Sequence, residues 1–362
     1  MMWRVIWAGL GALVVMFWNV ENYFDPFDDP LKNDNEFTPR AERHWTWSRF
    51  EAKRDGIAQT ILAAGDVWGE LPAVVGLCEV ENRMVVSQLV RKTMLEELGY
   101  GFVHRESPDE RGIDVALLYR KDRLRVLAVD SLRVPGVVTR DILYVKMIDR
   151  TTIAPLRSAI ALPSQKNARS TQYHPLHSAI DTAIPDESVI LDDDRTSSTD
   201  EGILHVFVVH LPSKRGGARA SADRRDAALG VLQHAVDSLL TDDPGCRILV
   251  MGDFNDTDPS VAGLMEPARQ SATPGYPSGT LKYHGRWERI DHFFLSPALF
   301  PADGRAEMQI FAPPFLLEAD KAWLGQKPRR TYVGPRYNGG LSDHLPICLR
   351  LNEPPVDSLE IK

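Results

Sequence analysis

The chain has 362 residues, of which 43% are hydrophobic and 25% are charged, as in ordinary globular proteins of one large or two smaller domains. At this length roughly three quarters of the unfolded surface can be buried, so the three cysteines are expected to be buried thiols and not a disulfide framework. The net charge of −8 argues against the broad basic surface of proteins that bind long nucleic acids tightly, so contact with nucleic acid must come from local basic loops.

The chain begins with an apolar segment. Residues 5–18 follow Arg4 and resemble the hydrophobic region of a signal peptide, but they are fewer than the about 20 residues that span a bilayer. They also run directly into Asn19, without room for a cleavage site. We expect residues 13–18 to form a buried strand and residues 1–12 to be an N-terminal stub or part of a leader. We find no complete signal peptide and no transmembrane segment in this sequence, and it does not decide between a cytoplasmic and an exported location.

Apolar runs and amphipathic segments alternate along the rest of the chain. The spacing of apolar residues predicts helices near 49–64, over 83–98, where Gly99 is well placed to end the helix, and over 218–240. Further strands are predicted at 73–78, 115–119, 124–129, 206–209, 248–251 and 292–295. Strands and helices mixed in this way, without an obvious linker, indicate a single α/β or α+β domain.

Two stretches interrupt this pattern. Residues 150–202 are rich in Ser, Thr, Asp and Pro, which predicts an irregular insertion between two strands, either a lid or a disordered segment. Residues 312–340 are also loop-rich. They hold four basic residues close together, Lys327, Arg329, Arg330 and Arg336. We therefore expect one domain over 13–351 with an insertion at 150–202, followed by a C-terminal tail at 352–362.

The strongest chemical signal is Met-Gly-Asp-Phe-Asn-Asp at residues 251–256, at the end of an apolar strand. Polar residues at the carboxyl end of a strand lie where α/β proteins usually form their sites. Asp253 can polarise water, and Asn255 can donate its amide to a phosphate oxygen. Taken alone, an ordinary turn explains the same residues, since Asp and Asn favour turns.

Other segments place carboxylates and imidazoles beside strands. Ser-Asp-His precedes the last apolar run, and because neighbours in an extended backbone point to opposite sides, Asp343 and His344 are expected to serve different partners. Asp291 begins another strand and can orient an imidazole. Glu79 offers the hard oxygen that Mg²⁺ prefers, although it could equally be an acid in the first turn of a helix. His210 precedes a basic, glycine-rich loop, which either holds a phosphate or is a solvated turn.

Together and in this order, these motifs resemble the endonuclease/exonuclease/phosphatase superfamily of DNase I-like metal-dependent phosphodiesterases. The family has a strand ending in Asn, a metal-binding Glu, a His at a strand end, Gly-Asp-x-Asn, an Asp that supports the catalytic His, and a final Ser-Asp-His. The matching residues are Asn19, Glu79, His210, Asp253, Asn255, Asp291, Asp343 and His344. The resemblance covers roughly 13–149 and 203–351. Segments 18–25, 110–119 and 329–346 look like a bacterial branch whose members are described mainly as nucleases or simply by the name of the superfamily.

The resemblance implies a four-layer α/β sandwich of two packed mixed sheets flanked by helices, with a Mg²⁺ or Mn²⁺ site at one edge. Glu79 would be the main metal ligand, with Asn19 nearby and Asp343 as a candidate second ligand. Asp253 would orient or deprotonate the attacking water, and Asn255 would hold the phosphate.

The two histidines would act on opposite sides of the phosphate. His344, fixed by Asp291, would donate a hydrogen bond to the scissile phosphate, and His210 would be a phosphate ligand or general acid. Whether His344 or Asp253 is the base stays open. Three basic residues are candidates for holding substrate phosphates, because their charged N–H groups suit phosphate oxygens: Arg111, Lys214 and Arg330.

The function implied is metal-dependent hydrolysis of phosphodiester bonds by an endo- or exonuclease acting on DNA or RNA. A phosphatase or phosphodiesterase acting on an inositol phosphate, a phospholipid head group or another small ester is the alternative, and an inactive binding module is a more distant one. No stable protein partner is evident. A lipid substrate would need exposed aromatic residues near the site; Trp45, Trp47 and Trp323 are candidates, but we expect them in the core.

Overall fold

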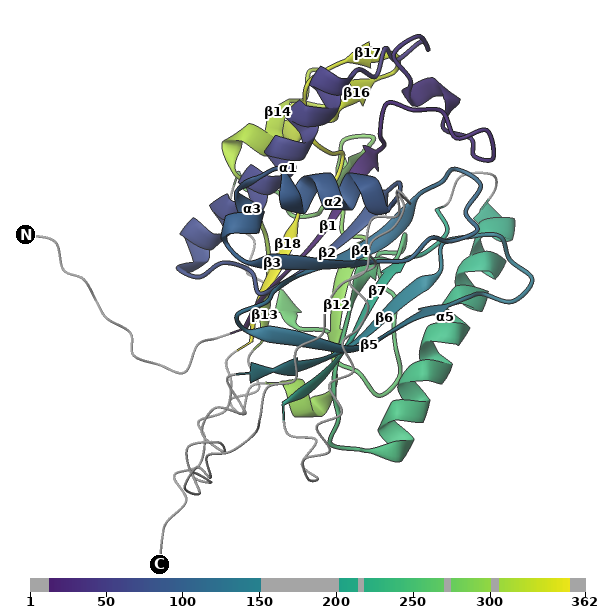
Figure 1. Cartoon of the computed structure of the whole chain (residues 1–362), viewed down its shortest axis with the longest axis vertical. Coiled ribbons are helices and arrows are strands. Elements are labelled where there is room, and N and C mark those ends of the chain that lie inside the picture. Colours follow the sequence, from purple (N-terminus) through teal and green to yellow (C-terminus); the bar gives the residue numbers. More distant parts are fainter. Residues whose placement is uncertain (1–12, 151–201, 214–217, 270–274, 301–305, 352–362) are drawn as a thin grey trace, which may run out of the picture.

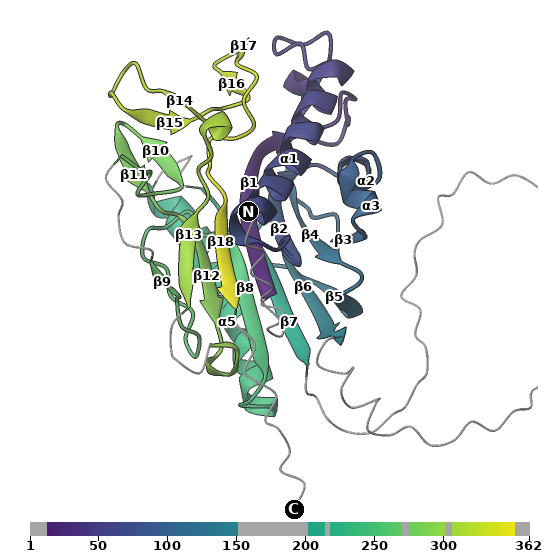
Figure 2. The same ribbon diagram turned by 90° about the vertical axis from the view of Figure 1, so that its left-hand side faces the viewer.

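The computed structural model describes residues 13–150, 202–213, 218–269, 275–300 and 306–351. Almost all of the predicted insertion, the segment 1–12 and the tail 352–362 lie outside these ranges. Within them, two β-sheets pack face to face and helices cover the outer face of each (Figures 1 and 2). The predicted sandwich of two mixed sheets flanked by helices is confirmed.

The first sheet has seven strands in the order β3-β4-β2-β1-β18-β13-β9. These strands are β1 (Leu13–Tyr23), β2 (Val74–Val80), β3 (Tyr100–His104), β4 (Asp114–Arg120), β9 (Ala268–Arg269), β13 (Glu307–Ile310) and β18 (Ile347–Leu351). The central strand β1 runs parallel to β2 and antiparallel to β18. It continues five residues beyond the predicted end at 18, so Asn19 lies within the strand and not after it.

The second sheet has five strands in the order β12-β8-β7-β6-β5. They are β5 (Leu124–Leu132), β6 (Ile142–Asp149), β7 (Ile203–His210), β8 (Arg247–Asp253) and β12 (Asp291–Leu295). Strands β7 and β8 are parallel, and β12 is antiparallel to β8. As a result, the carboxyl ends of β7 and β8 and the start of β12 meet at one edge.

The space between the sheets is filled by apolar side chains from both. Val15 and Phe17 of β1 belong to the same buried cluster as Val206 of β7 and Leu249 of β8. The sheets approach closely at Gly76 of β2, where a Cβ atom would lie 2.5 Å from the sulfur of Met251 in β8. This close packing fixes the position of one sheet edge against the other.

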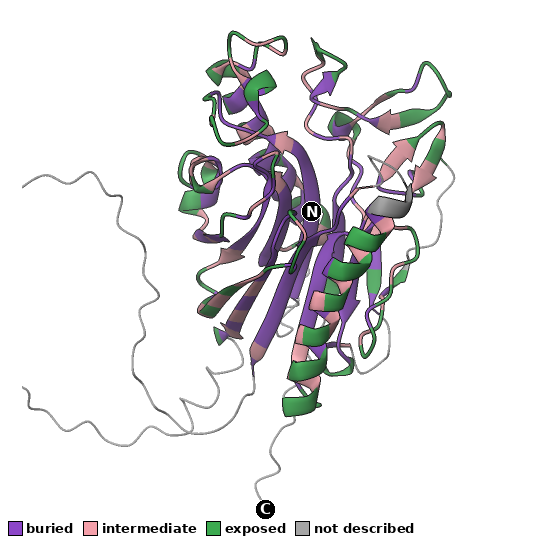
Figure 3. Cartoon of the chain, turned by 90° about the vertical axis from the view of Figure 1, so that its right-hand side faces the viewer, coloured by how far each residue is buried: buried purple, intermediate pink, exposed green. Residues whose placement is uncertain are grey.

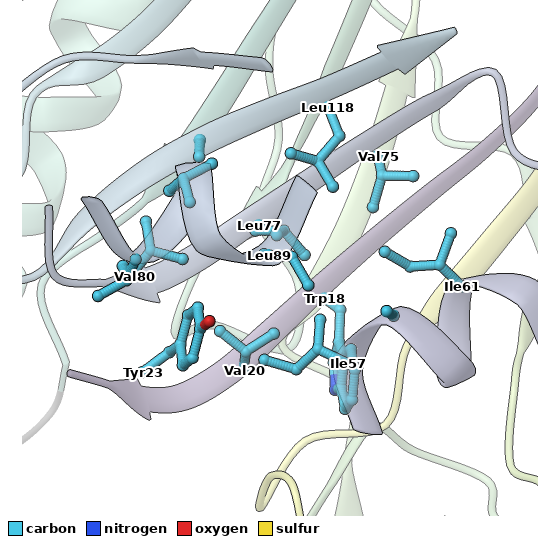
Figure 4. Packing of buried hydrophobic residues seen from close by; sticks show 14 of the residues in the cluster. Trp18, Val20, Tyr23, Ile57, Ile61, Val75, Leu77, Val80, Leu89 and Leu118 are labelled. Carbon is cyan, nitrogen blue, oxygen red and sulfur yellow. The ribbon is translucent and has the colours of Figure 1, made fainter. Parts of the chain in front are cut away.

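Helices α1 (Trp47–Trp68), α2 (Arg83–Arg91) and α3 (Met94–Glu97) cover the outer face of the first sheet. Figure 4 shows Ile57 and Ile61 of α1 beside Trp18 and Val20 of β1. The single helix predicted over 83–98 is two helices, because Thr93 caps a new one by accepting a hydrogen bond from the amide of Leu95. Gly99 follows in the left-handed conformation at φ 76°, as predicted.

The long helix α5 (Ala218–Asp242) covers the second sheet. Leu232 and Val236 pack against Phe207 and Val250 of β7 and β8, while the opposite side of the helix is exposed (Figure 3). The helix ends two residues beyond the predicted position.

Short hairpins rise above the edge of the sheets at which β1 ends (Figure 2). They are β10 (Leu281–Tyr283) with β11 (Arg286–Glu288), β14 (Leu317–Ala319) with β15 (Gln326–Pro328), and β16 (Tyr332–Val333) with β17 (Arg336–Tyr337). Three 3-10 helices complete the described chain: η1 (Asn35–Phe37), η2 (Pro297–Leu299) and η3 (Pro314–Leu316). The stretch predicted as loop-rich at 312–340 thus contains two of these hairpins.

The three cysteines are free and buried, as expected. Of the three tryptophans expected in the core, only Trp45 is buried. Trp47 and Trp323 are 42% and 56% exposed, so the expectation is wrong for these two. No helix within the described ranges is long and apolar enough to cross a membrane.

Candidate active site

The residues of the sequence motifs meet where the two sheets share an edge. In the first sheet, Asn19 of β1 lies opposite Cys78, directly before Glu79. In the second sheet, Asp253 of β8 is paired with His210 of β7 on one side and Asp291 of β12 on the other. The strand register therefore collects side chains from most of the length of the chain.

Asp253 lies at the centre of this group and is buried. Its Oδ2 atom accepts a hydrogen bond from Asn19 Nδ2 at 3.1 Å, and it lies 3.6 Å from His210 Nε2 and 3.9 Å from His344 Nε2. Burial is the main cause that raises the pKa of Asp253 to about 7, and the charge of Asp291 adds to it, whereas His344 lowers it. This carboxyl group is therefore balanced between its two protonation states near neutral pH.

His344 is oriented by Asp291. Its Nδ1 lies 2.9 Å from Asp291 Oδ2, and the hydroxyl of Thr280 donates a hydrogen bond to the same oxygen. Burial lowers the pKa of His344, but the charge and hydrogen bond of Asp291 outweigh burial, so the pKa is well above its ordinary value. The imidazole is thus cationic at neutral pH, with Nε2 directed to the side of Asp253.

The serine of the Ser-Asp-His motif has a structural role, because it connects this segment to β1. The hydroxyl of Ser342 donates to the backbone oxygen of Asn19 at 2.6 Å and accepts from the amide of His344 at 2.9 Å. The indole of Trp18 donates to the backbone oxygen of His344 at 2.9 Å. The segment before β18 is therefore tied to β1, which places His344 beside the end of that strand.

His210 is held from its backbone side. Arg140 donates hydrogen bonds to the backbone oxygens of His210 and Leu211, at 3.2 and 2.7 Å, and pairs with Asp109 at 3.2 Å. Burial, followed by the nearby positive charges of Arg140 and others, lowers the pKa of His210 well below its usual value. Its Nδ1 is buried and has no hydrogen-bond partner in the described structure. This imidazole is therefore neutral, in contrast to His344.

Glu79 lies at an irregularity of β2, where the pairing with β4 shifts register between Cys78 and Val80. Its φ is 60°, a left-handed conformation that is costly for a residue with a long side chain. Its Oε2 accepts a hydrogen bond from the amide of Asn22 at 2.8 Å. The other oxygen, Oε1, accepts none from the residues that the structure describes and lies 4.0 Å from His210 Nε2, and 14% of the side chain is exposed.

This arrangement suits a hard divalent cation. Glu79 Oε1 is a partly accessible carboxylate oxygen, and it lies 4.0 Å from His210 Nε2, which lies 3.6 Å from Asp253 Oδ2. Asn19 adds an amide oxygen, which also accepts a hydrogen bond from the amide of Glu21. Such oxygens are the donor type that Mg²⁺ and Mn²⁺ prefer.

Asp343 points away from His344, as the alternation of an extended chain predicts. Its Oδ2 lies 3.1 Å from Arg330 Nη2, and the same guanidinium donates through Nε to buried Glu21 at 2.9 Å. Burial and the charge of Asp343 raise the pKa of Glu21 to about 7, against the effect of Arg330. The candidate second metal ligand is therefore paired with a cation in this structure.

The remaining candidates lie in different surroundings. The side chain of Asn255 donates to the backbone oxygen of Leu211 at 2.9 Å, which leaves its second amide hydrogen for another acceptor. Arg111 is 40% exposed, donates to the side-chain oxygen of Asn22 at 2.6 Å, and lies 3.8 Å from Glu79. Lys214 lies outside the described residues.

Several residues that support the site have no recognisable signal in the sequence. Thr280 orients Asp291, Arg140 fixes the end of β7, and Lys53 is a buried amine that donates to the backbone oxygen of Glu21 and to Thr331. Thr280 comes directly before a short hairpin strand and Arg140 follows a turn, where neither residue type is unusual.

The profile of the endonuclease/exonuclease/phosphatase family matches residues 14–152 and 194–353, which include every one of the motif residues. The chain belongs to this family. Its members are phosphoester hydrolases. The match is interrupted between residues 152 and 194, inside the segment predicted as an insertion. No curated protein shows significant similarity to the chain.

Solved structures with the same fold are distant in sequence. Truncated TDP2 from Caenorhabditis elegans has a TM-score of 0.51 at 14% identity, over 95% of this chain and 99% of that one. A mannosyl-6-phosphatase from Bacteroides thetaiotaomicron has a TM-score of 0.51 at 14% identity, over 93% and 98%. An endonuclease/exonuclease/phosphatase family protein from the same bacterium scores 0.51 at 14% identity, over 94% and 98%. These matches show the DNase I-like fold.

Proposed function

We propose that the chain hydrolyses phosphodiester bonds with the help of Mg²⁺ or Mn²⁺, as an endo- or exonuclease acting on DNA or RNA. The observation that supports this most is the position of one buried carboxylate, Asp253, within 4 Å of two imidazoles, of which His210 is neutral and His344 is cationic. The partly exposed side chain of Glu79 lies near these three groups. A phosphoryl group placed among these four side chains would find a proton acceptor, a cationic donor, a neutral imidazole and a metal ligand.

Glu79, with Asn19 beside it, would hold the cation. When bound, the metal would polarise a phosphoryl oxygen and stabilise the charge of the leaving oxygen. The left-handed backbone of Glu79 and its hydrogen bond from Asn22 fix the carboxylate in place before any cation arrives. Asp343 would take part only after leaving its ion pair with Arg330.

The electrostatics favour Asp253 over His344 as the base. With its pKa near 7, Asp253 can accept a proton from water at neutral pH, whereas His344 already carries its proton. His344 would instead donate through Nε2 to a phosphoryl oxygen, where negative charge increases in the transition state.

His210 and Asn255 would act on the other phosphoryl oxygens. The neutral imidazole of His210 can donate one hydrogen bond without adding charge, and Asn255 can donate the amide hydrogen not bound to Leu211. Positioning by these fixed donors supplies much of the rate enhancement in phosphoryl transfer.

A small phosphoester is the alternative substrate. One protein with a similar fold is a mannosyl-6-phosphatase, and the net charge of −8 does not favour a long polyanion. The two candidate substrate classes differ in the ester that is hydrolysed, which is a phosphodiester or a phosphomonoester.

The test is one panel of substrates with the whole chain: plasmid DNA, RNA, bis-p-nitrophenyl phosphate and p-nitrophenyl phosphate, each with Mg²⁺, Mn²⁺, Ca²⁺ or EDTA. We expect hydrolysis of diesters with Mg²⁺ or Mn²⁺ and none with EDTA. Full activity in EDTA would refute the metal-dependent mechanism. Hydrolysis of the monoester alone would show that the protein is a phosphatase and not a diesterase.

A further inference from the structure

A cavity of about 410 Å³ opens beside the candidate active site, between the segment that follows β1 and the hairpins β14–β15 and β16–β17. Its charged lining consists of four cations and two carboxylates: Arg43, Arg111, Lys327, Arg330, Glu21 and Glu36. Three of the cations also lie near carboxylates outside the lining, Arg111 near Glu79, Lys327 near Glu318 and Arg330 near Asp343.

Two cations of the cavity lining border the proposed metal site. Arg111 lies 3.8 Å from Glu79, and Arg330 lies 3.1 Å from Asp343, so both cations belong to the border between the two spaces. Lys327 and Arg43 also line the cavity. A substrate whose scissile phosphate sits at Glu79 would therefore extend into a space lined by guanidinium and ammonium groups.

Several of these cations keep donors for a ligand. Arg111 uses one terminal nitrogen for Asn22, and Arg330 uses Nε and Nη2 for Glu21 and Asp343. The other N–H groups of these two guanidiniums have no acceptor among the described residues. Lys327 has one weak ion pair, with Glu318 at 3.4 Å, and its side chain is 32% exposed. An anion can therefore bind without breaking the contacts that hold the guanidiniums in place.

The lining does not offer a surface for base stacking. Tyr332 is the aromatic residue that lines the cavity, and it is 4% exposed. The guanidinium of Arg43 covers its ring at 5.0 Å from the centroid. Stacking on exposed rings is the usual way in which proteins hold single-stranded bases. Among the described residues, this cavity therefore offers charged hydrogen-bond donors and no exposed ring on which a base could stack.

We propose that this cavity binds a second phosphate of the substrate, next to the scissile one, through Arg111, Arg330 and Lys327. The proposal rests on the proposed function of the same site. It narrows the substrate class to phosphodiesters that carry a further phosphate within a nucleotide unit of the scissile bond. The cavity volume of about 410 Å³ lies near the lower end of the range for ligand cavities, about 300–1,000 Å³, and is large enough for one nucleotide-sized group.

The kinetic experiment compares substrates that differ only in the second phosphate. Thymidine 5′-(p-nitrophenyl phosphate) is measured with and without a 3′-phosphate, and thymidine 3′-(p-nitrophenyl phosphate) with and without a 5′-phosphate. In the wild type we expect one of these pairs to show a kcat/KM that is at least about tenfold higher with the second phosphate than without it. A ratio of this size corresponds to one charge-assisted hydrogen bond. Lys327→Gln should remove most of that ratio. Lys321→Gln, which changes an exposed lysine of the same hairpin outside the cavity, should keep it.

A binding experiment separates this proposal from the proposed function. Calorimetry measures thymidine 3′,5′-bisphosphate and the two monophosphates with the wild type and both lysine variants, with Mg²⁺ present. Tighter binding of the bisphosphate that Lys327→Gln loses supports the subsite, even if no ester is hydrolysed and the proposed function fails. Equal affinity for bisphosphate and monophosphates, or kinetic ratios unchanged in Lys327→Gln, would overturn the subsite while leaving hydrolysis established.

Discussion

Asp253 and His344 are neighbours in the site, but their different hydrogen-bond partners give them different charge states. Asp253 and His344 approach to 3.9 Å, but Asp253 accepts one hydrogen bond from Asn19 and one from a backbone amide, whereas His344 is bound to the carboxylate of Asp291. Burial works against the charged form of both groups. Asp291 compensates for that cost at His344 and increases it at Asp253. The pair therefore consists of a cationic donor and an acid with a pKa near neutrality.

Replacing either residue should remove catalysis and keep the fold. We expect Asp253→Ala and His344→Ala each to lower kcat by about 10²–10⁴-fold, the usual contribution of a general acid–base group, with a melting temperature within a few degrees of the wild type. Steady-state kinetics on bis-p-nitrophenyl phosphate and thermal unfolding measure the two effects. His284→Ala, an exposed histidine in the turn between β10 and β11, is the matched control. Activity of His344→Ala equal to that of the control would exclude the assigned role.

The raised pKa of Asp253 predicts the pH dependence of the reaction. A base must lose its proton first, so with a pKa of about 7 the value of kcat/KM should fall about tenfold for each pH unit below 7. A pH–rate profile at saturating metal concentration measures this. Asp253→Asn should retain a small residual rate without this acidic decrease. A wild-type profile that stays flat between pH 5 and 7 would mean that Asp253 is not the base.

At the scale of elements, the sequence predicted the strands that carry the site because their apolar runs are continuous and their polar residues stand at the ends. It missed β6, in which buried and half-buried residues alternate, and it joined α2 and α3 across Thr93. It also could not show that Thr280 and Arg140 support the site. Their contacts join residues 11 and 70 or more positions apart, so neither follows from a local pattern.

The junction between β2 and α2 carries a buried acid with a stability consequence. Glu81 accepts a hydrogen bond from the amide of Asp25 at 2.6 Å, and burial together with the charges of Asp25 and Asp34 raises the pKa of Glu81 to about 9. The folded protein therefore holds a proton that the unfolded chain releases near pH 4.5. Stability from this group is complete below the unfolded pKa and is lost as the pH rises toward 9.

Glu81→Gln should remove this dependence, because an amide keeps the acceptor for Asp25 without a charge. We expect the variant to be more stable than the wild type at pH 8, with a smaller difference at pH 4. Urea unfolding at several pH values gives the free energies. Glu36→Gln, a change at an acid of η1 whose side chain is 53% exposed, should leave the dependence as in the wild type. If Glu81→Gln follows the wild-type curve from pH 4 to 8, the buried acid has no such effect.

Across the whole molecule, the site depends on how two sheets share an edge and not on any one segment. Asn19 and His344 are 325 positions apart but are connected through Ser342. The family pattern in the sequence identifies these residues, while their distances follow from the parallel register of β1 with β2 and of β7 with β8. The segment predicted as an insertion enters and leaves the fold at the other end of β6 and β7, away from His210.

Deleting most of that segment should preserve the fold. Strands β6 and β7 are antiparallel neighbours, Ile148 lies opposite Ile203, and the amide of Asp149 donates to the backbone oxygen of Gly202 at 2.9 Å. A short turn can therefore join them once residues 152–200 are removed and replaced by Asn-Gly. Closing a shorter loop costs less entropy, so we expect the free energy of unfolding to rise by an amount on the order of 2 kcal/mol if the segment adds no contacts of its own.

Thermal unfolding and diester hydrolysis measure the effect of this deletion, with removal of residues 152–176 alone as an intermediate control. A shortened chain that cannot fold, while the control folds, would show that residues 177–200 belong to the core and that the prediction of a peripheral insertion is wrong.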